Sequence, residues 1–225
     1  MGTHHRLLSA GRLAELWRQE GLAGLVRGGL RAARRDVVRS RALDLFEIGL
    51  AHLDAVAVPP RPAAARIVVV GGSVGEDGEA VRAALRRADP RSERRLAAGA
   101  QAVCVAAGDE LAHVTWLVAS EGQRRASEPI PYPVDFAERQ ACIPWVFTLD
   151  AFRGRGVGGF GFDTALHHLA ARGFGSVRFV VRVDNIAMRR LIARYDLHLV
   201  ARFTALRLLG RELTWPRRRA VAKEE

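Results

Sequence analysis

The sequence has 225 residues, of which 49% are hydrophobic and 26% are charged, a composition that suits one folded domain with an additional segment. It excludes a chain that is disordered throughout, because such chains have too few apolar residues to build a core. No apolar run approaches the length of a membrane span, and the N-terminus lacks the apolar core of a secretory signal, so we expect a cytoplasmic protein. The two cysteines, Cys104 and Cys142, match no metal or redox spacing, and the sequence predicts no metal site.

The formal net charge is +11, from 35 basic and 24 acidic residues, and arginine carries the excess. Nucleic-acid binding, attraction to an acidic membrane and capture of a polyphosphate cofactor would each explain such a charge. A nucleic-acid reader usually concentrates its cations in one helix or stripe, whereas these arginines are spread along the whole chain. We therefore expect no nucleic-acid partner, and the charge alone decides nothing further.

Residues 7–54 differ in pattern from the rest. Leu13, Leu16 and Trp17 begin a series of apolar residues at three- and four-residue steps, which predicts amphipathic helix, and the glycines among them divide it into two shorter helices. The alternating stretch 42–48 predicts a half-buried strand. Two interpretations stay open: the helices pack on their own domain, or they contact a membrane surface or a partner protein.

The linker Pro59-Pro60-Arg61-Pro62 is the predicted boundary. It separates an N-terminal helical appendage, residues 1–58, from a domain over residues 63–215, which a charged tail, residues 216–225, follows.

The predicted domain combines strands with helices. The predicted strands span residues 66–70, 103–106, 111–118, 143–149, 177–183 and 197–209, and the predicted helices span residues 79–88, 94–98, 156–172 and 186–194. Residues 121–135 are polar and proline-rich and predict a loop, while Pro144 places its strand at an edge or a bulge. Because the strands first form a meander and only later alternate with helices, the order predicts a mixed α/β sheet.

The glycine-rich segment Arg153-Gly154-Arg155-Gly156-Val157-Gly158 lies between a predicted strand and a predicted helix. Such a turn presents several backbone N–H groups together with the positive end of the helix dipole, and glycine allows a phosphate to approach closely. Arg153 and Arg155 add two cations. The segment therefore predicts a pyrophosphate site, with an ordinary glycine-rich surface turn as the alternative.

A nucleotide-binding Rossmann module is a second alternative. Gly156, Gly158 and Gly161 satisfy G-x-G-x-x-G, and Asp184 ends the next predicted strand where a ribose-binding acid would stand. Two features count against it: only one helix and one strand follow Asp184, and the glycines come several residues after the strand.

Taken with its context, the segment resembles the acyl-CoA signature of the GNAT superfamily of GCN5-related N-acetyltransferases. That signature reads (Gln or Arg)-x-x-Gly-x-(Gly or Ala), and Arg153-x-x-Gly156-x-Gly158 matches it in full. The resemblance is specific over residues 146–209, weak over residues 66–135 and absent before Pro59. It implies a mostly antiparallel mixed sheet, splayed at two central parallel strands, 143–149 and 177–183, with helices on both faces. An acyl-CoA, expected to be acetyl-CoA, would enter the cleft between these strands.

The resemblance also implies roles for individual residues. The backbone groups of Phe147 and Thr148 would pair with pantetheine, Asn185 would lie against the same arm, and a backbone N–H near Thr148 or Leu149 would stabilise the oxyanion. The pyrophosphate would be bound by the loop residues Arg153, Gly154, Arg155, Gly156, Val157, Gly158 and Gly159.

The implied reaction is direct attack of a neutral amine on the thioester in a ternary complex. Many members of the family carry a tyrosine seven residues after the asparagine, which protonates the departing thiolate, but here that position is Ile192. Tyr195, three residues further on, is the candidate acid, and His113 is the candidate base. Each has a purely structural alternative.

The acceptor amine stays open between small molecules and peptides, and residues 121–135 are expected to line its pocket. Monomer and homodimer are both compatible with the sequence. A non-catalytic acyl-CoA-binding module is the alternative within the same fold, and the missing tyrosine motivates it.

Overall fold

The computed structural model describes residues 38–56, 59–71, 76–108, 110–127, 132–208 and 211–217. The helices predicted within residues 7–37 and the end of the charged tail lie outside the described residues. The strands are β1 (Val38–Gly49), β2 (Ala65–Val70), β3 (Gln101–Ala107), β4 (Glu110–Leu117), β5 (Gln140–Cys142), β6 (Val146–Thr148), β7 (Ser176–Arg182), β8 (Leu197–Leu208) and β9 (Arg211–Arg217). The helices are α2 (Glu76–Ala88), α3 (Ser92–Ala97), α4 (Glu121–Ser127), α5 (Val157–Ala171) and α6 (Ile186–Ile192), with 3-10 turns η1 (Leu53–Ala55) and η2 (Asp150–Phe152).

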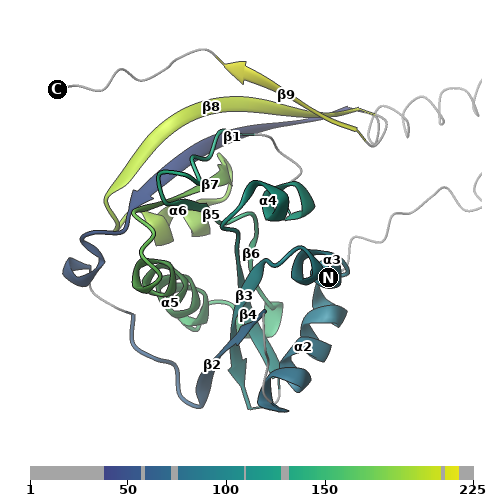
Figure 1. The fold of residues 1–225 in the computed structure, drawn as a ribbon, viewed down its shortest axis with the longest axis vertical. Coiled ribbons are helices and arrows are strands. Elements are labelled where there is room, and N and C mark those ends of the chain that lie inside the picture. Colours follow the sequence, from purple (N-terminus) through teal and green to yellow (C-terminus); the bar gives the residue numbers. More distant parts are fainter. Residues whose placement is uncertain are drawn as a thin grey trace, which may run out of the picture.

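The strands form two sheets, in the orders β2-β3-β4-β6 and β5-β7-β1-β8-β9. Every strand pair is antiparallel except β5 with β7. Helix α5 lies on one side of the first sheet, and α2 and α3 lie on the other (Figure 1). This arrangement confirms the predicted mixed, mostly antiparallel architecture and contradicts the Rossmann alternative, which requires a mostly parallel sheet. None of the described helices is long and apolar enough to cross a membrane.

A bulge separates β5 from β6. Cys142 bridges Val118 of the neighbouring strand, and the Trp145 carbonyl accepts a bond from the Trp116 N–H at 3.0 Å. Three residue steps on one strand therefore match two on the other, which defines a β-bulge. Pro144 lies inside the bulge, where its missing N–H interrupts no regular pairing.

The two sheets diverge directly after this bulge. The N–H of Ile143 donates to the Arg178 carbonyl at 3.0 Å, and beyond that residue β6 pairs with β4 and not with β7. The predicted divergence from the strand at residues 177–183 is confirmed, and the parallel pairs that precede it involve residues 140–142. The continuous strand predicted over residues 143–149 is wrong, because the proline bulge breaks it.

Strand β1 lies in the middle of the second sheet, antiparallel to both β7 and β8. Its large apolar side chains are almost fully buried, with Leu45 1% and Ile48 0% exposed. The alternating pattern therefore predicted a strand correctly, but its assignment to an appendage over residues 1–58 is wrong. Only residues 7–37 of that segment remain candidates for the predicted membrane or partner contact.

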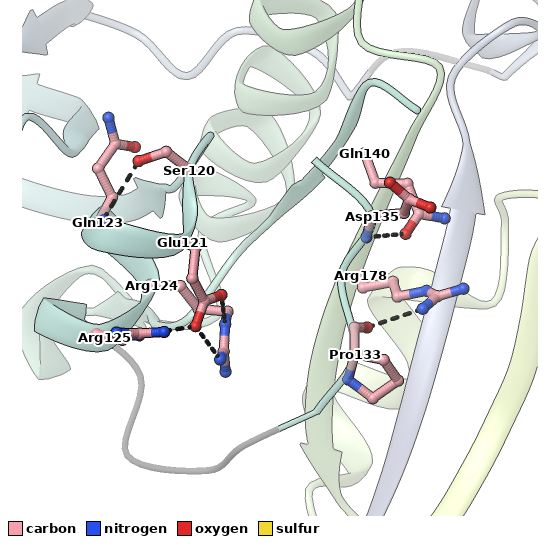
Figure 2. Close-up of polar contacts among 9 residues, drawn as sticks. All are labelled: Ser120, Glu121, Gln123, Arg124, Arg125, Pro133, Asp135, Gln140 and Arg178. Carbon is pink, nitrogen blue, oxygen red and sulfur yellow. Dashed lines mark hydrogen bonds and ion pairs between the residues drawn. The ribbon is translucent and has the colours of Figure 1, made fainter. Parts of the chain in front are cut away.

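The predicted loop begins instead with a helix, α4. The Ser120 hydroxyl accepts a bond from the Gln123 N–H at 3.3 Å, which caps the helix start (Figure 2). Glu121 forms ion pairs with Arg124 at 2.6 Å and Arg125 at 3.0 Å, at the spacings that support a helix. The Ser-x-x-Gln capping pattern was the signal for this helix, and the following proline-rich sequence concealed it.

The segment after α4 is attached to the second sheet by a polar network. Arg178 of β7 donates to the Pro133 carbonyl at 2.8 Å and pairs with Glu47 of β1 at 2.6 Å. Gln140 donates to Glu47 at 3.2 Å and accepts from the Asp135 N–H at 2.9 Å. Several of these side chains are drawn in Figure 2. The segment therefore covers one face of the β1–β7 pair.

We predict that a chain beginning at Pro59, which lacks β1, fails to unfold cooperatively. Burial of each large apolar side chain contributes about 1.5–3 kcal/mol, and a whole domain is stable by only about 5–15 kcal/mol. Urea denaturation followed by circular dichroism tests this against a chain beginning at Val38, which keeps β1. Equal midpoints and slopes for the two chains would show that β1 is a dispensable appendage.

Candidate functional site

A cleft opens where β6 leaves β7, with a volume of about 560 Å³. This volume lies within the range of small-molecule sites. Its lining comes from β4, β6, the loop before α5, the first turn of α5 and α6: His113, Val146, Phe147, Thr148, Phe152, Arg153, Gly154, Gly156, Gly158, Gly159, Asn185, Ala187, Met188 and Leu191. The structure thus brings the glycine-rich loop, the strand before it and the predicted asparagine to one place. The described part of residues 121–135 contributes nothing to this lining.

Of the ten predicted cofactor-binding residues, eight line the cleft, and Arg155 and Val157 do not. Arg155 is exposed on the loop and forms no ion pair with the described residues. The Val157 side chain is 4% exposed and packs in a small core cluster with Val105 and Ala112. Val157 therefore anchors the start of α5 in the core, so its side chain is not available to a ligand.

The loop has the backbone shape that its glycines permit. Gly154 and Gly156 have φ angles of 74° and 77°, in the left-handed region that glycine enters without steric cost. Gly156 begins α5 without a side-chain cap, so the first-turn N–H groups have no intrahelical partner and are suited to an anion. Arg153 holds the loop against β6, since its Nε donates to the Thr148 carbonyl at 3.2 Å and its Nη1 pairs with Asp150 at 2.9 Å.

The open edge of β6 presents alternate backbone groups. The Trp145 carbonyl and the Leu149 N–H are both bonded to β4, each at 3.0 Å. Because hydrogen-bonded and non-bonded pairs alternate in an antiparallel ladder, the backbone groups of Val146 and Thr148 face away from β4. These two residues are therefore the ones that can pair with an extended ligand in the cleft.

This alternation corrects two sequence-based assignments. Phe147 is opposite Val114 at a bonded position of the ladder, so its backbone groups are turned toward β4, although the residue borders the cleft. The Leu149 N–H is already bonded to Ala112, which leaves it unsuited to stabilise an oxyanion. Val146 was missed because the position of the bulge decides which backbone groups of β6 point toward β4. The sequence does not give that position.

His113 lines the cleft and is fully buried. Its Nδ1 is 2.8 Å from the Thr148 hydroxyl and its Nε2 is 2.8 Å from the Thr115 hydroxyl. Burial lowers the pKa of His113 to about 4, because the apolar surroundings disfavour the charged ring. A ring with both nitrogens occupied and so low a pKa is a poor general base at neutral pH.

Tyr195 does not line the cleft. Its hydroxyl donates to the buried Asp163 of α5 at 2.9 Å and accepts from Arg194 at 2.7 Å. Burial is the main cause that raises its pKa. The candidate acid is therefore a structural tyrosine that joins α5 to the end of α6, and Ile192, at the position of the family's tyrosine, is fully buried in the core.

Asn185 connects the cleft to α6. Its side chain accepts a bond from the Met188 N–H at 3.1 Å, which makes it the N-cap of that helix. Ala187, Met188 and Leu191 then form an apolar wall of the cleft, on adjacent positions of one helix face. In the sequence, only the helical spacing of these three apolar residues could have indicated that they line a cleft. Among the described residues, no group of three or more His, Cys, Asp or Glu side chains could hold a metal ion.

No protein-family model and no curated protein matches this sequence. Among solved structures, the GCN5-related glucosamine N-acetyltransferase region of a fungal multidomain GH3 β-N-acetylglucosaminidase superposes with a TM-score of 0.53 at 14% identity, covering 80% of this chain and 22% of that one. The chain has the fold of GCN5-related N-acetyltransferases. Two further GCN5-related N-acetyltransferase structures superpose with lower TM-scores. The one from Sphaerobacter thermophilus has a TM-score of 0.48 at 17% identity and covers 83% of this chain. The one from Kribbella flavida has a TM-score of 0.44 at 16% identity and covers 81% of this chain. The chain spans 58% and 64% of their respective lengths.

Two glycines allow α5 to lie close to the first sheet of this GNAT fold. A Cβ on Gly158 would lie 2.8 Å from the Thr148 hydroxyl oxygen, and a Cβ on Gly161 would lie 2.3 Å from the His113 ring. Real side chains do not approach so closely, so both positions exclude any larger residue without movement of the neighbours. The spacing that resembled a nucleotide fingerprint therefore reflects helix–sheet packing at Gly161.

We predict that Gly161→Ala destabilises the fold by about 2–3 kcal/mol, because overpacking forces a fully buried histidine to move. Gly159→Ala is the matched control in the same helix, since its Cβ would meet nothing closer than 3.6 Å. That control should be neutral or stabilise by up to about 1 kcal/mol through helix propensity. Urea denaturation measures both, and equal stabilities of the two variants would contradict the packing argument.

We predict that His113 makes the protein less stable below pH 6.5. Its pKa is about 4 in the folded chain against 6.5 when unfolded, so between these values the unfolded state binds the extra proton. The contribution of His113 to the free energy of unfolding is complete above pH 6.5. It falls by about 3 kcal/mol as the pH decreases to 4. Denaturation of wild type and His113→Leu from pH 4 to 7.5 isolates this contribution. A stability difference between the two that does not change with pH would contradict it.

Proposed function

We propose that this chain binds an acyl-CoA in the cleft beside β6 and transfers its acyl group to an amine of a small molecule or peptide. Acetyl-CoA is the expected donor, and the reaction is expected to proceed by direct attack in a ternary complex. One observation carries the proposal: a glycine-rich, uncapped helix start and the open edge of a strand face the same cleft.

The two halves of the cleft suit the two halves of the cofactor. The N–H groups at the start of α5, with Arg153 and the exposed Arg155 nearby, suit a pyrophosphate. The open backbone of Val146 and Thr148 suits the extended pantetheine arm, whose amide groups can pair with a strand edge as an added strand does. The apolar side chains of α6 cover the other side of that arm.

The chemistry places a developing negative charge on the thioester oxygen as the amine attacks. A backbone N–H of Val146 or Thr148 can stabilise this charge, since both face away from β4. Apart from Arg153, His113 is the only titratable side chain among the described residues that line the cleft. Because His113 stays neutral and bonded, we expect the amine to lose its proton to solvent or to the acceptor's own surroundings.

The same observation favours a second candidate, a non-catalytic module that binds acyl-CoA. Neither His113 nor Tyr195 is arranged as a base or an acid, and a binding module needs neither. Release of free CoA thiol on mixing protein, acetyl-CoA and a pool of amines distinguishes the two. Thiol release that depends on an amine supports transfer, and tight acetyl-CoA binding without release supports the module.

We predict that acetyl-CoA and CoA, but not NAD, raise the thermal unfolding midpoint. At a hundredfold over Kd, a ligand adds about 2.7 kcal/mol, which corresponds to roughly 5 °C or more for a domain of this size. Gly156→Asp should abolish the rise, because it places a negative charge at the loop. Gly156→Asn is the control, since asparagine also tolerates the left-handed backbone without adding charge.

The result for NAD and the comparison of the two variants decide the assignment. Protection by NAD, or by no ligand at all, would contradict the acyl-CoA site. An equal loss of protection in Gly156→Asp and Gly156→Asn would show that the backbone of the loop was disturbed and that charge was not the cause.

A further inference from the structure

A continuous chain of hydrogen bonds leads from the core to the cleft. It begins at the Thr115 hydroxyl, passes through both nitrogens of His113 and ends at the Thr148 hydroxyl, with two contacts of 2.8 Å each. Thr115 and His113 are both fully buried, whereas Thr148 is partly exposed and lines the cleft. The hydrogen-bond chain therefore has one buried end, at Thr115, and one end that a ligand can reach, at Thr148.

The buried end at Thr115 fixes the donor and acceptor of each hydrogen bond from Thr115 to Thr148. Among the described residues, His113 is the only hydrogen-bond partner of the Thr115 hydroxyl. If Nε2 carried the ring proton, the Thr115 O–H would be a buried donor with no acceptor, and an unmade buried donor is more costly than an unmade acceptor. Thr115 therefore donates to Nε2, and the proton on Nδ1 donates to Thr148.

This direction leaves one proton unused, on the Thr148 hydroxyl at the cleft. The oxygen of Thr148 accepts from His113 and has no further partner for its O–H among the described residues. It lies on β6 beside the backbone groups that face the open edge. Gly158 and Gly161 of α5 provide the space that the hydrogen-bonded side chains occupy, since a Cβ on either glycine would displace Thr148 or His113.

We propose that the Thr148 hydroxyl donates a hydrogen bond to a carbonyl oxygen of the bound acyl-CoA, and that His113 is the residue that positions this hydroxyl. The inference rests on the proposed function, because the acyl-CoA supplies the acceptor oxygen. It gives the buried histidine a role in ligand binding in which it neither touches the ligand nor exchanges a proton.

Titration calorimetry with CoA and acetyl-CoA tests the hydroxyl itself. Thr148→Val keeps the shape of the side chain and removes the donor, and it should weaken binding roughly 5- to 10-fold, the value of one hydrogen bond. Thr148→Ser keeps the donor and should bind within about twofold of wild type. Binding of Thr148→Val as tight as that of wild type would overturn the proposal. Absence of binding to wild type would overturn the proposed function itself, which makes the two failures distinguishable.

Substitutions of His113 test the positioning. His113→Leu removes the donor to Thr148 and should weaken binding as Thr148→Val does, whereas His113→Asn keeps an N–H on that side and should restore part of the affinity. In the double variant His113→Leu with Thr148→Val, the loss should equal that of Thr148→Val alone, since both remove one coupled interaction. Losses that multiply would show two independent effects and would overturn the role of His113. Unfolding midpoints above the assay temperature for all variants exclude simple unfolding.

Discussion

The structure depends on the place where β6 stops pairing with β7. A single bulge around Pro144 ends the parallel contact at the bond from Ile143 to Arg178 and turns the following strand toward β4. The divergence leaves one edge of β6 without a strand partner, although the Arg153 side chain bonds the Thr148 carbonyl there, and it places the glycine-rich loop at the end of that edge. Without the bulge the two strands would continue as one sheet, their backbone groups would satisfy each other, and there would be no space for a ligand between them.

The layer beneath the cleft explains residues that a sequence motif would assign to phosphate binding. His113 is a large polar side chain in a fully buried position, and its two threonine partners make that position tolerable. Helix α5 must pass directly over it, so Gly158 and Gly161 are required by the ring and hydroxyl beneath them. Only Gly154 and Gly156 owe their identity to the backbone shape of the loop. One run of glycines therefore serves two different physical requirements.

The second wall of the cleft depends on a strand from the other end of the chain. Strand β1 pairs with β7 along seven residue pairs, from Leu43 with Arg182 to Gly49 with Ser176. The buried Asp44 of β1 forms an ion pair with Arg189 of α6 at 2.7 Å. The segment before the linker thus supports both β7, from which β6 diverges, and α6, which lines the cleft. Stability of the N-terminal half and integrity of the proposed site are coupled through these contacts.

The sequence by itself determined most elements and the identity of the loop, because glycine, proline and apolar periodicity act over a few residues. The helix after Gly156, the hairpin of β3 and β4, and the strand in residues 42–48 all follow from such local rules. It did not determine which strand β1 would join, which backbone groups of β6 face the cleft, or that Tyr195 bonds Asp163. Those outcomes depend on contacts between residues far apart in the chain. Local sequence patterns do not distinguish the alternatives, and burial and strand pairing decide among them. Tertiary structure therefore decided the surroundings of His113, and with them its unsuitability as a base.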